Sequence, residues 1–168
     1  KNSAVQNASQ TLIGSDGVIR ADAMTTGDGG RVVAWADGST GFYGSISARG
    51  GSQSGNGGFV ETSGKGALQA FGRVNVGAAN GSGGTWLLDP TDITIVAGGL
   101  EAYGACGQSM ICWGDTTSSV GVDAINGAMS SYGSIQIQAT HDISLQTGLI
   151  VPYYGPLSLQ AGNDITLG

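Results

Sequence analysis

The sequence predicts an all-β protein, a right-handed parallel β-helix with one irregular excursion that contains a short helix. Three observations favour this fold: glycine-rich units recur before apolar strands, strand-like segments recur every 22 to 28 residues, and apolar residues alternate with polar ones inside them. A repeat of this size cannot bury its own apolar face. Successive repeats should therefore stack, with equivalent strands paired in parallel and connections of the usual right hand.

The glycine-rich unit is Gly-x-Gly-Gly, and each copy precedes an apolar-rich strand. The copies occupy residues 27–30, 55–58 and 81–84, so they recur after 28 and then 26 residues. A second strand keeps a similar spacing at residues 17–21, 44–48 and 72–76. We expect the glycines to form the corners at which one strand ends and the next begins.

Near the carboxyl end, six positions recur at a single offset of 22 residues. The matched pairs are Ile135 and Leu157, Ile137 and Leu159, Ala139 and Ala161, Asp142 and Asp164, Ile143 and Ile165, and Leu145 and Leu167. One offset shared by six pairs predicts two further stacked repeats.

The pattern divides the chain into β-helix coils over 1–97, an excursion over 98–133 and further coils over 134–168. Within the excursion, Val122, Ile125 and Met129 have helical spacing, and the Thr and Ser residues at 116–119 could cap such a helix. We expect this helix to pack against or cap the coils.

Composition restricts the function. The chain has 168 residues, 32 of them glycine, only 11% charged residues and a net charge of −6. Its six Lys and Arg are spread singly and form no basic stripe, which argues against nucleic acid as a partner. No apolar run approaches the roughly 20 residues of a membrane helix, so membrane insertion is not expected.

Cys106 and Cys112 are predicted to form a local disulfide in a glycine-flanked stretch. In a loop-entropy estimate, closing so short a loop is worth only about 2 kcal/mol, so it would hold a local excursion. Two free thiols or a metal site are the alternatives, although the one histidine, His141, is distant in sequence.

Several segments together resemble the mature region of filamentous haemagglutinin-like exoproteins of bacterial two-partner secretion systems. The most specific is Trp-Leu-Leu-Asp-Pro-Thr-Asp-Ile-Thr-Ile at 86–95, and the others are 29–37, 44–51, 57–65 and 163–167. The resemblance implies a large adhesin that passes through an outer-membrane β-barrel transporter and stays at the bacterial cell surface as a secreted parallel β-helix. Its implied partners are a host-cell receptor, a matrix protein or a glycan.

The chain departs from that family in two respects. The amino-terminal Asn-Pro-Asn-Gly-Ile type of secretion motif is absent from the sequence, and the excursion with Cys106 and Cys112 is not a feature of the common shaft. The chain is therefore interpreted as a segment downstream of the secretion domain.

No catalytic, metal-binding or cofactor-binding residues are predicted. Asp89 and Asp92 flank Pro90 and could act as an acid and base, but Asp-Pro-Thr-Asp is also turn chemistry. His141 precedes Asp142, which the repeat marks as a corner residue. A carbohydrate-active β-helix enzyme that uses these carboxylates, and capture of a host haem-carrier protein, are the alternatives to adhesion.

Aromatic residues in or near the irregular segments are the candidate ligand-binding residues, because binding residues concentrate on loops held by a rigid scaffold. They are Tyr103, Trp113, Tyr132, Tyr153 and Tyr154. Trp35 and Trp86 follow Gly-Gly in strands and are expected to pack in or against the coil. Asn7 and Asn80 begin two glycosylation sequons.

Overall fold

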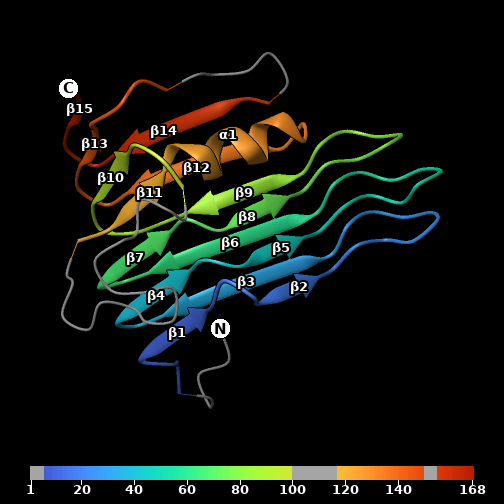
Figure 1. The fold of residues 1–168 in the computed structure, drawn as a ribbon, viewed down its shortest axis with the longest axis horizontal. Coiled ribbons are helices and arrows are strands. Elements are labelled where there is room, and N and C mark those ends of the chain that lie inside the picture. The colour runs from blue at the N-terminus through green and yellow to red at the C-terminus, as the bar shows by residue number, and fades with distance from the viewer. Residues whose placement is uncertain (1–5, 100–116, 150–154) are drawn as a thin grey trace.

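The fold is mostly β with a single helix in the part of the chain that the computed structural model describes, residues 6–99, 117–149 and 155–168. The strands form three sheets, and all strand pairs in these ranges are parallel (Figure 1). Over the first repeats the chain visits the three sheets in a fixed order, and we call one such passage a circuit.

The largest sheet has seven strands. Their order is β1 (Gln10–Ile13), β4 (Ser39–Phe42), β7 (Ala67–Ala70), β11 (Ser119–Gly121), β10 (Ile93–Val96), β13 (Ile143–Leu145) and β15 (Ile165–Leu167). The five-stranded sheet has the order β14 (Leu157–Ala161), β12 (Ser134–Ala139), β9 (Thr85–Leu88), β6 (Phe59–Gly64) and β3 (Arg31–Ala36). The three-stranded sheet contains β2 (Val18–Arg20), β5 (Ser45–Ser47) and β8 (Arg73–Asn75).

The strand register confirms the sequence repeats. Val60 of β6 aligns with Val32 of β3 and with Trp86 of β9. At the carboxyl end, Ile135 aligns with Leu157 and Ile143 with Ile165, as the 22-residue offset predicts. Equivalent side chains therefore lie one above another along each sheet.

The repeated Gly-x-Gly-Gly unit is explained by close backbone contacts. At the third position of each unit, a Cβ would clash with a backbone carbonyl oxygen. At Gly29 it would lie 2.1 Å from the carbonyl oxygen of Ala48. The distance is 1.7 Å at Gly57, to the carbonyl oxygen of Val76, and 1.7 Å at Gly83, to the carbonyl oxygen of Tyr132. These distances are far below van der Waals contact. Only glycine fits at this position, two residues before β3, β6 and β9 begin.

One strand, β11, does not belong to the repeat that the sequence shows. β11 lies between β7 and β10, so β10 is one strand position further from β7 than simple stacking would place it. Its sequence, Ser-Val-Gly, is too short to display an alternating pattern. Its central residue, Val120, is nevertheless fully buried in the core.

The predicted helix is confirmed as α1 (Val122–Ser130), and its apolar residues are buried against the core. The helix packs next to β8 at the end of the stack of β2, β5 and β8, in the place where a fourth strand would lie (Figure 1). The predicted Thr and Ser cap is wrong: Gly121 is the N-cap, with no side-chain cap hydrogen bond. Ser119 belongs to β11, and the Ser118 hydroxyl instead accepts a hydrogen bond from the Leu68 amide at 3.1 Å.

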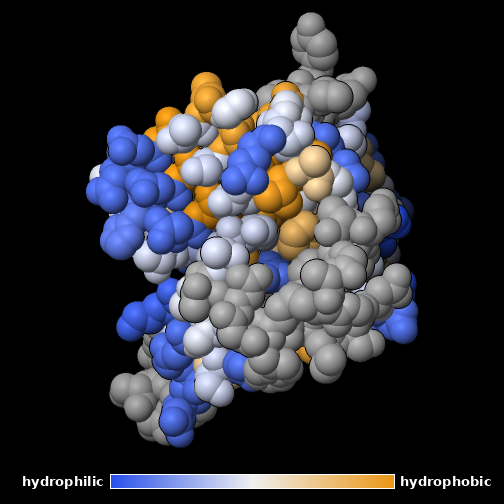
Figure 2. All heavy atoms as spheres, turned by 60° about the vertical axis from the view of Figure 1, so that its left-hand side comes forward, coloured by the Kyte–Doolittle hydropathy of each residue, from blue (hydrophilic) through white to orange (hydrophobic). Residues whose placement is uncertain are grey.

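Inward-facing residues of all three sheets and of α1 form one continuous core. Trp86 is its largest fully buried side chain, with its ring edge-on to Phe42 at a centroid distance of 6.3 Å. The indole N–H donates to the Thr62 hydroxyl at 2.9 Å, so the one polar group of Trp86 is satisfied. The last strands are less well covered: Leu167 is 75% exposed, and Figure 2 shows apolar side chains gathered toward this carboxyl-terminal end.

The connections into β3, β6 and β9 are long and project from the sheets as a stack of three loops, which we call the loop ladder (Figure 1). Asn56 joins all three. Its backbone N–H donates a hydrogen bond to the Asp28 carboxylate at 2.7 Å, and its side-chain oxygen accepts one from the Ser82 backbone N–H at 2.9 Å. Asn80, of the second sequon, donates from its side chain to the Ser52 carbonyl at 2.9 Å. The loops thus repeat the parallel order of the strands.

Candidate ligand-binding groove

A groove lies on the outer face of the three-stranded sheet. Ile46 and Val74 point into the core, so their neighbours on β5 and β8 point outward. The register places these outward residues in two rows, Val18, Ser45 and Arg73 in one, and Arg20, Ser47 and Asn75 in the other. Both rows line a cavity of about 480 Å³.

Helix α1 forms one wall of this cavity. Ala124 and Gly127 line it from positions i and i+3, which share one helix face, and Ser131 lines it from the C-cap. Asp123, in the first turn, is the acidic residue of this wall. The helix replaces a fourth strand, and it therefore closes the side of the groove beyond β8.

The groove continues toward the loop ladder. A second cavity of about 350 Å³ shares Arg49, Asn75 and Ser131 with the first. Its remaining lining comes from the loops at 23–24, 50–52 and 77–79. Together the two cavities form one elongated groove that runs from the sheet face onto the loops.

Arg49 is fixed in place by Asp22. The guanidinium donates to one carboxylate oxygen through Nη2 at 2.9 Å and Nε at 3.2 Å, and the Arg49 amide donates to the other at 2.7 Å. The Ser47 hydroxyl donates to the same carboxylate at 3.0 Å. These contacts connect two successive circuits at the edge of the groove.

Burial raises the pKa of Asp22, but the hydrogen bonds from the Arg49 side chain and backbone and from Ser47 outweigh it, so the pKa lies below its ordinary value. A carboxyl whose pKa is lowered in the folded state stabilises the fold above its unfolded pKa, and this contribution is lost as the pH falls through the folded value. The stabilisation is therefore present at neutral pH and disappears in acid.

Asp22→Asn is expected to lower the free energy of unfolding by about 1 kcal/mol or less at pH 7, since the Arg49 partner is half exposed. The difference from the parent chain should shrink as the pH falls below 4, where the parent carboxyl also becomes neutral. Urea unfolding at several pH values measures it. Asp37→Asn, at an exposed position without an ion pair among the described residues, is the control. A pH-independent difference would contradict the role of the carboxylate charge.

The structure tests little of the predicted aromatic site. Of the five predicted ligand-binding residues, Tyr103, Trp113, Tyr153 and Tyr154 lie outside the described residues, as do Cys106 and Cys112 of the predicted disulfide. Tyr132 is 58% exposed and has φ of 62° just after α1. It directly follows Ser131, which lines both cavities of the groove.

The carboxylates considered for catalysis lie at exposed corners. Asp92 accepts a hydrogen bond from the Asp142 amide at 3.1 Å, and Asp142 accepts one from the Asp164 amide at 3.1 Å. The His141 Nδ1 atom lies 3.8 Å from the Asp92 Oδ1 atom, and both side chains are more than half exposed. Asp89 lines a separate shallow cavity of about 170 Å³ with Gln138 and Gln160. This stack of corner residues fits the structural interpretation of the repeat.

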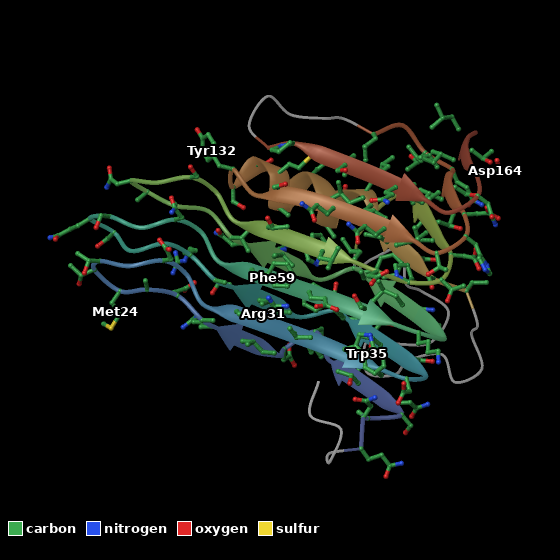
Figure 3. All side chains as sticks on the ribbon, turned by 180° about the vertical axis from the view of Figure 1, so that it is seen from behind. Met24, Arg31, Trp35, Phe59, Tyr132 and Asp164 are labelled. Carbon is green, nitrogen blue, oxygen red and sulfur yellow. The ribbon has the colours of Figure 1, made fainter. Side chains whose placement is uncertain are left out.

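The two tryptophans that lie in strands, Trp35 and Trp86, differ in how deeply they are buried. Trp86 is buried in the core, as expected, whereas Trp35 is only partly buried on the outer face of the five-stranded sheet (Figure 3). On the same face the Arg31 guanidinium stacks over the Phe59 ring at 4.2 Å and lies 3.9 Å from the Glu61 carboxylate. Trp35, Arg31 and Glu61 line a cavity of about 440 Å³.

No protein-family model matches the sequence, and no curated protein matches it. Within the described ranges, no helix is long and apolar enough to cross a membrane, and no group of three or more His, Cys, Asp or Glu is arranged to hold a metal ion.

Proposed function

We propose that the three parallel sheets are the faces of a right-handed parallel β-helix. The proposal is supported by the order in which the chain visits the sheets and by the stacking of equivalent residues at the repeat spacing. The hand follows the strong preference of parallel strand connections for a right-handed crossover. In this arrangement, each circuit buries its apolar face against the next.

The function that we propose for the chain is display of a binding surface: a non-catalytic segment of a secreted bacterial surface adhesin. The sequence segments at 29–37, 44–51, 57–65, 86–95 and 163–167 support the assignment to filamentous haemagglutinin-like exoproteins. The parent protein would then use an outer-membrane β-barrel transporter as its secretion partner. Its ligand would be a host-cell receptor, a matrix protein or a glycan.

One observation carries the binding role. The stacked circuits place an elongated groove with charged and hydrogen-bonding side chains on the outside of the three-stranded sheet. The exposed carboxylates near the carboxyl end lie apart from that groove, at the corners of the repeats. A rigid scaffold with polar groups on an open face suits recognition of an extended ligand.

The test is a binding titration of the purified, folded chain on epithelial cells, on immobilised matrix proteins and on a glycan panel. We expect saturable binding to at least one of these surfaces, and none by the urea-unfolded chain. A polysaccharide digestion assay run in parallel should release no reducing ends. Absence of binding by the folded chain would overturn the display role, and release of reducing ends would overturn the non-catalytic assignment.

A further inference from the structure

The groove on the outer face of β2, β5 and β8 concentrates positive charge in an acidic protein. The chain has six Lys and Arg against 12 Asp and Glu. Three of those six cations, Arg20, Arg49 and Arg73, line this one cavity. The acidic residues beside them are Asp22, which forms an ion pair with Arg49, and Asp123 on α1. The local charge is therefore positive, opposite in sign to that of the whole chain.

Two of the three arginines have no ionic partner in the part of the chain that the structure describes. Among the described residues, neither Arg20 nor Arg73 forms an ion pair. They lie on the same sheet face, two strands and two register positions apart, which places their Cα atoms about 12 Å from each other. An arginine fork binds carboxylate or sulfate oxygens through two parallel hydrogen bonds, so each can hold one anionic group.

The neighbouring side chains supply hydrogen bonds. Ser45 lies beside Arg73 in its row, and Ser47 and Asn75 lie beside Arg20 in the other. The Asn75 side-chain oxygen accepts a hydrogen bond from the Gly77 amide at 3.0 Å, and its NH₂ group has no partner in the described part of the chain. Hydroxyl and amide groups between two cations suit a ligand that alternates anionic and hydroxyl groups.

The lining also argues against other polymers. Among the described residues, no aromatic side chain lines either cavity, so they offer no base stacking of the kind that holds single-stranded nucleic acid. An extended peptide binds most readily along an open strand edge. The floor of this groove is instead a sheet face, and the edge beyond β8 is covered by α1.

We infer that this groove binds an acidic polysaccharide, with Arg20 and Arg73 each holding a carboxylate or sulfate group and Ser47 and Asn75 binding the hydroxyls between them. Arg49 is held by Asp22 and extends the positive surface toward the loop ladder. This inference rests on the proposed binding function and names the class of ligand.

The experiment measures binding of the whole chain to three polymers by isothermal titration calorimetry at low and high salt. Polygalacturonate carries only carboxylates, dextran sulfate carries only sulfates, and dextran is neutral. We expect saturable binding to one or both acidic polymers, weakening as salt rises, and none to dextran. The acidic polymer that binds identifies which anionic group the arginines hold.

The decisive variant is R20Q/R73Q, which removes two exposed charges and leaves the core untouched. Its affinity for the acidic polymer should fall at least tenfold. The matched control R31Q/K65Q removes the same net charge elsewhere and should change affinity less than twofold. Equal losses in both variants, or equal binding of the parent chain to poly-glutamate or to single-stranded DNA, would overturn the inference. Absence of binding of the parent chain to either acidic polymer, with saturable binding to cells retained, would overturn the inference while leaving the display role intact.

Discussion

Trp86→Ala is expected to lower the free energy of unfolding by about 3–5 kcal/mol, the range observed when a large aromatic residue is removed from a packed core. Trp86 is fully buried and contacts Phe42 edge-on. Truncation leaves a cavity between the sheets and also removes the hydrogen-bond partner of the buried Thr62 hydroxyl. Equilibrium unfolding in urea, followed by far-ultraviolet circular dichroism, measures the loss.

Trp35→Ala is the matched control because the same side chain is removed from the outer face of the five-stranded sheet. Its destabilisation should be clearly smaller than that of Trp86→Ala, since the ring is only partly buried. Equal losses for the two variants would contradict the assignment of Trp86 to the core and Trp35 to the surface.

Gly57→Ala is expected to destabilise the fold by at least about 3 kcal/mol, because the new methyl group meets backbone atoms that belong to neighbouring circuits. The added Cβ would lie 1.7 Å from the Val76 carbonyl oxygen and 2.3 Å from the Gly84 nitrogen. These two atoms are hydrogen-bonded to each other at 2.7 Å and adjoin β8 and β9, so moving either one breaks that bond or shifts the neighbouring strand. The midpoint of urea unfolding should fall sharply, or the chain should fail to fold.

Gly127→Ala provides the control for that prediction. A Cβ at Gly127, in the interior of α1, would meet no atom within 4 Å. Alanine is the better helix former by about 0.5–1 kcal/mol, so this variant should be slightly more stable than the parent chain. Similar destabilisation by both substitutions would show that Gly57 is not under the steric constraint of the stacked circuits.

Much of the strand register could be predicted from the sequence, since Val32, Val60 and Trp86 recur at the spacing at which their strands pair. The helix was predictable for the same reason, from the spacing of Val122, Ile125 and Met129. β11 was not predictable. Three residues cannot show a period, and the strand exists because it fills the position between β7 and β10.

The groove was not predicted from the sequence, because its residues are far apart along the chain. Arg20, Arg49 and Arg73 occur singly, one in each of three successive repeats, and so form no basic run. Parallel stacking brings them to one face, and α1 supplies the wall from a fourth segment. A periodic comparison of charged positions across the repeats would have been the signal for this site.

The groove, the core and the loop ladder all depend on the parallel register of successive circuits, and nuclear Overhauser contacts in solution test it most directly. In the three-stranded sheet, Ile19 aligns with Ile46, and Ile46 aligns with Val74. We predict methyl–methyl contacts between Ile19 and Ile46 and between Ile46 and Val74, with no strong Hα–Hα contacts of an antiparallel pair. Absence of both methyl contacts, or a set of antiparallel Hα–Hα contacts among these strands, would contradict the account.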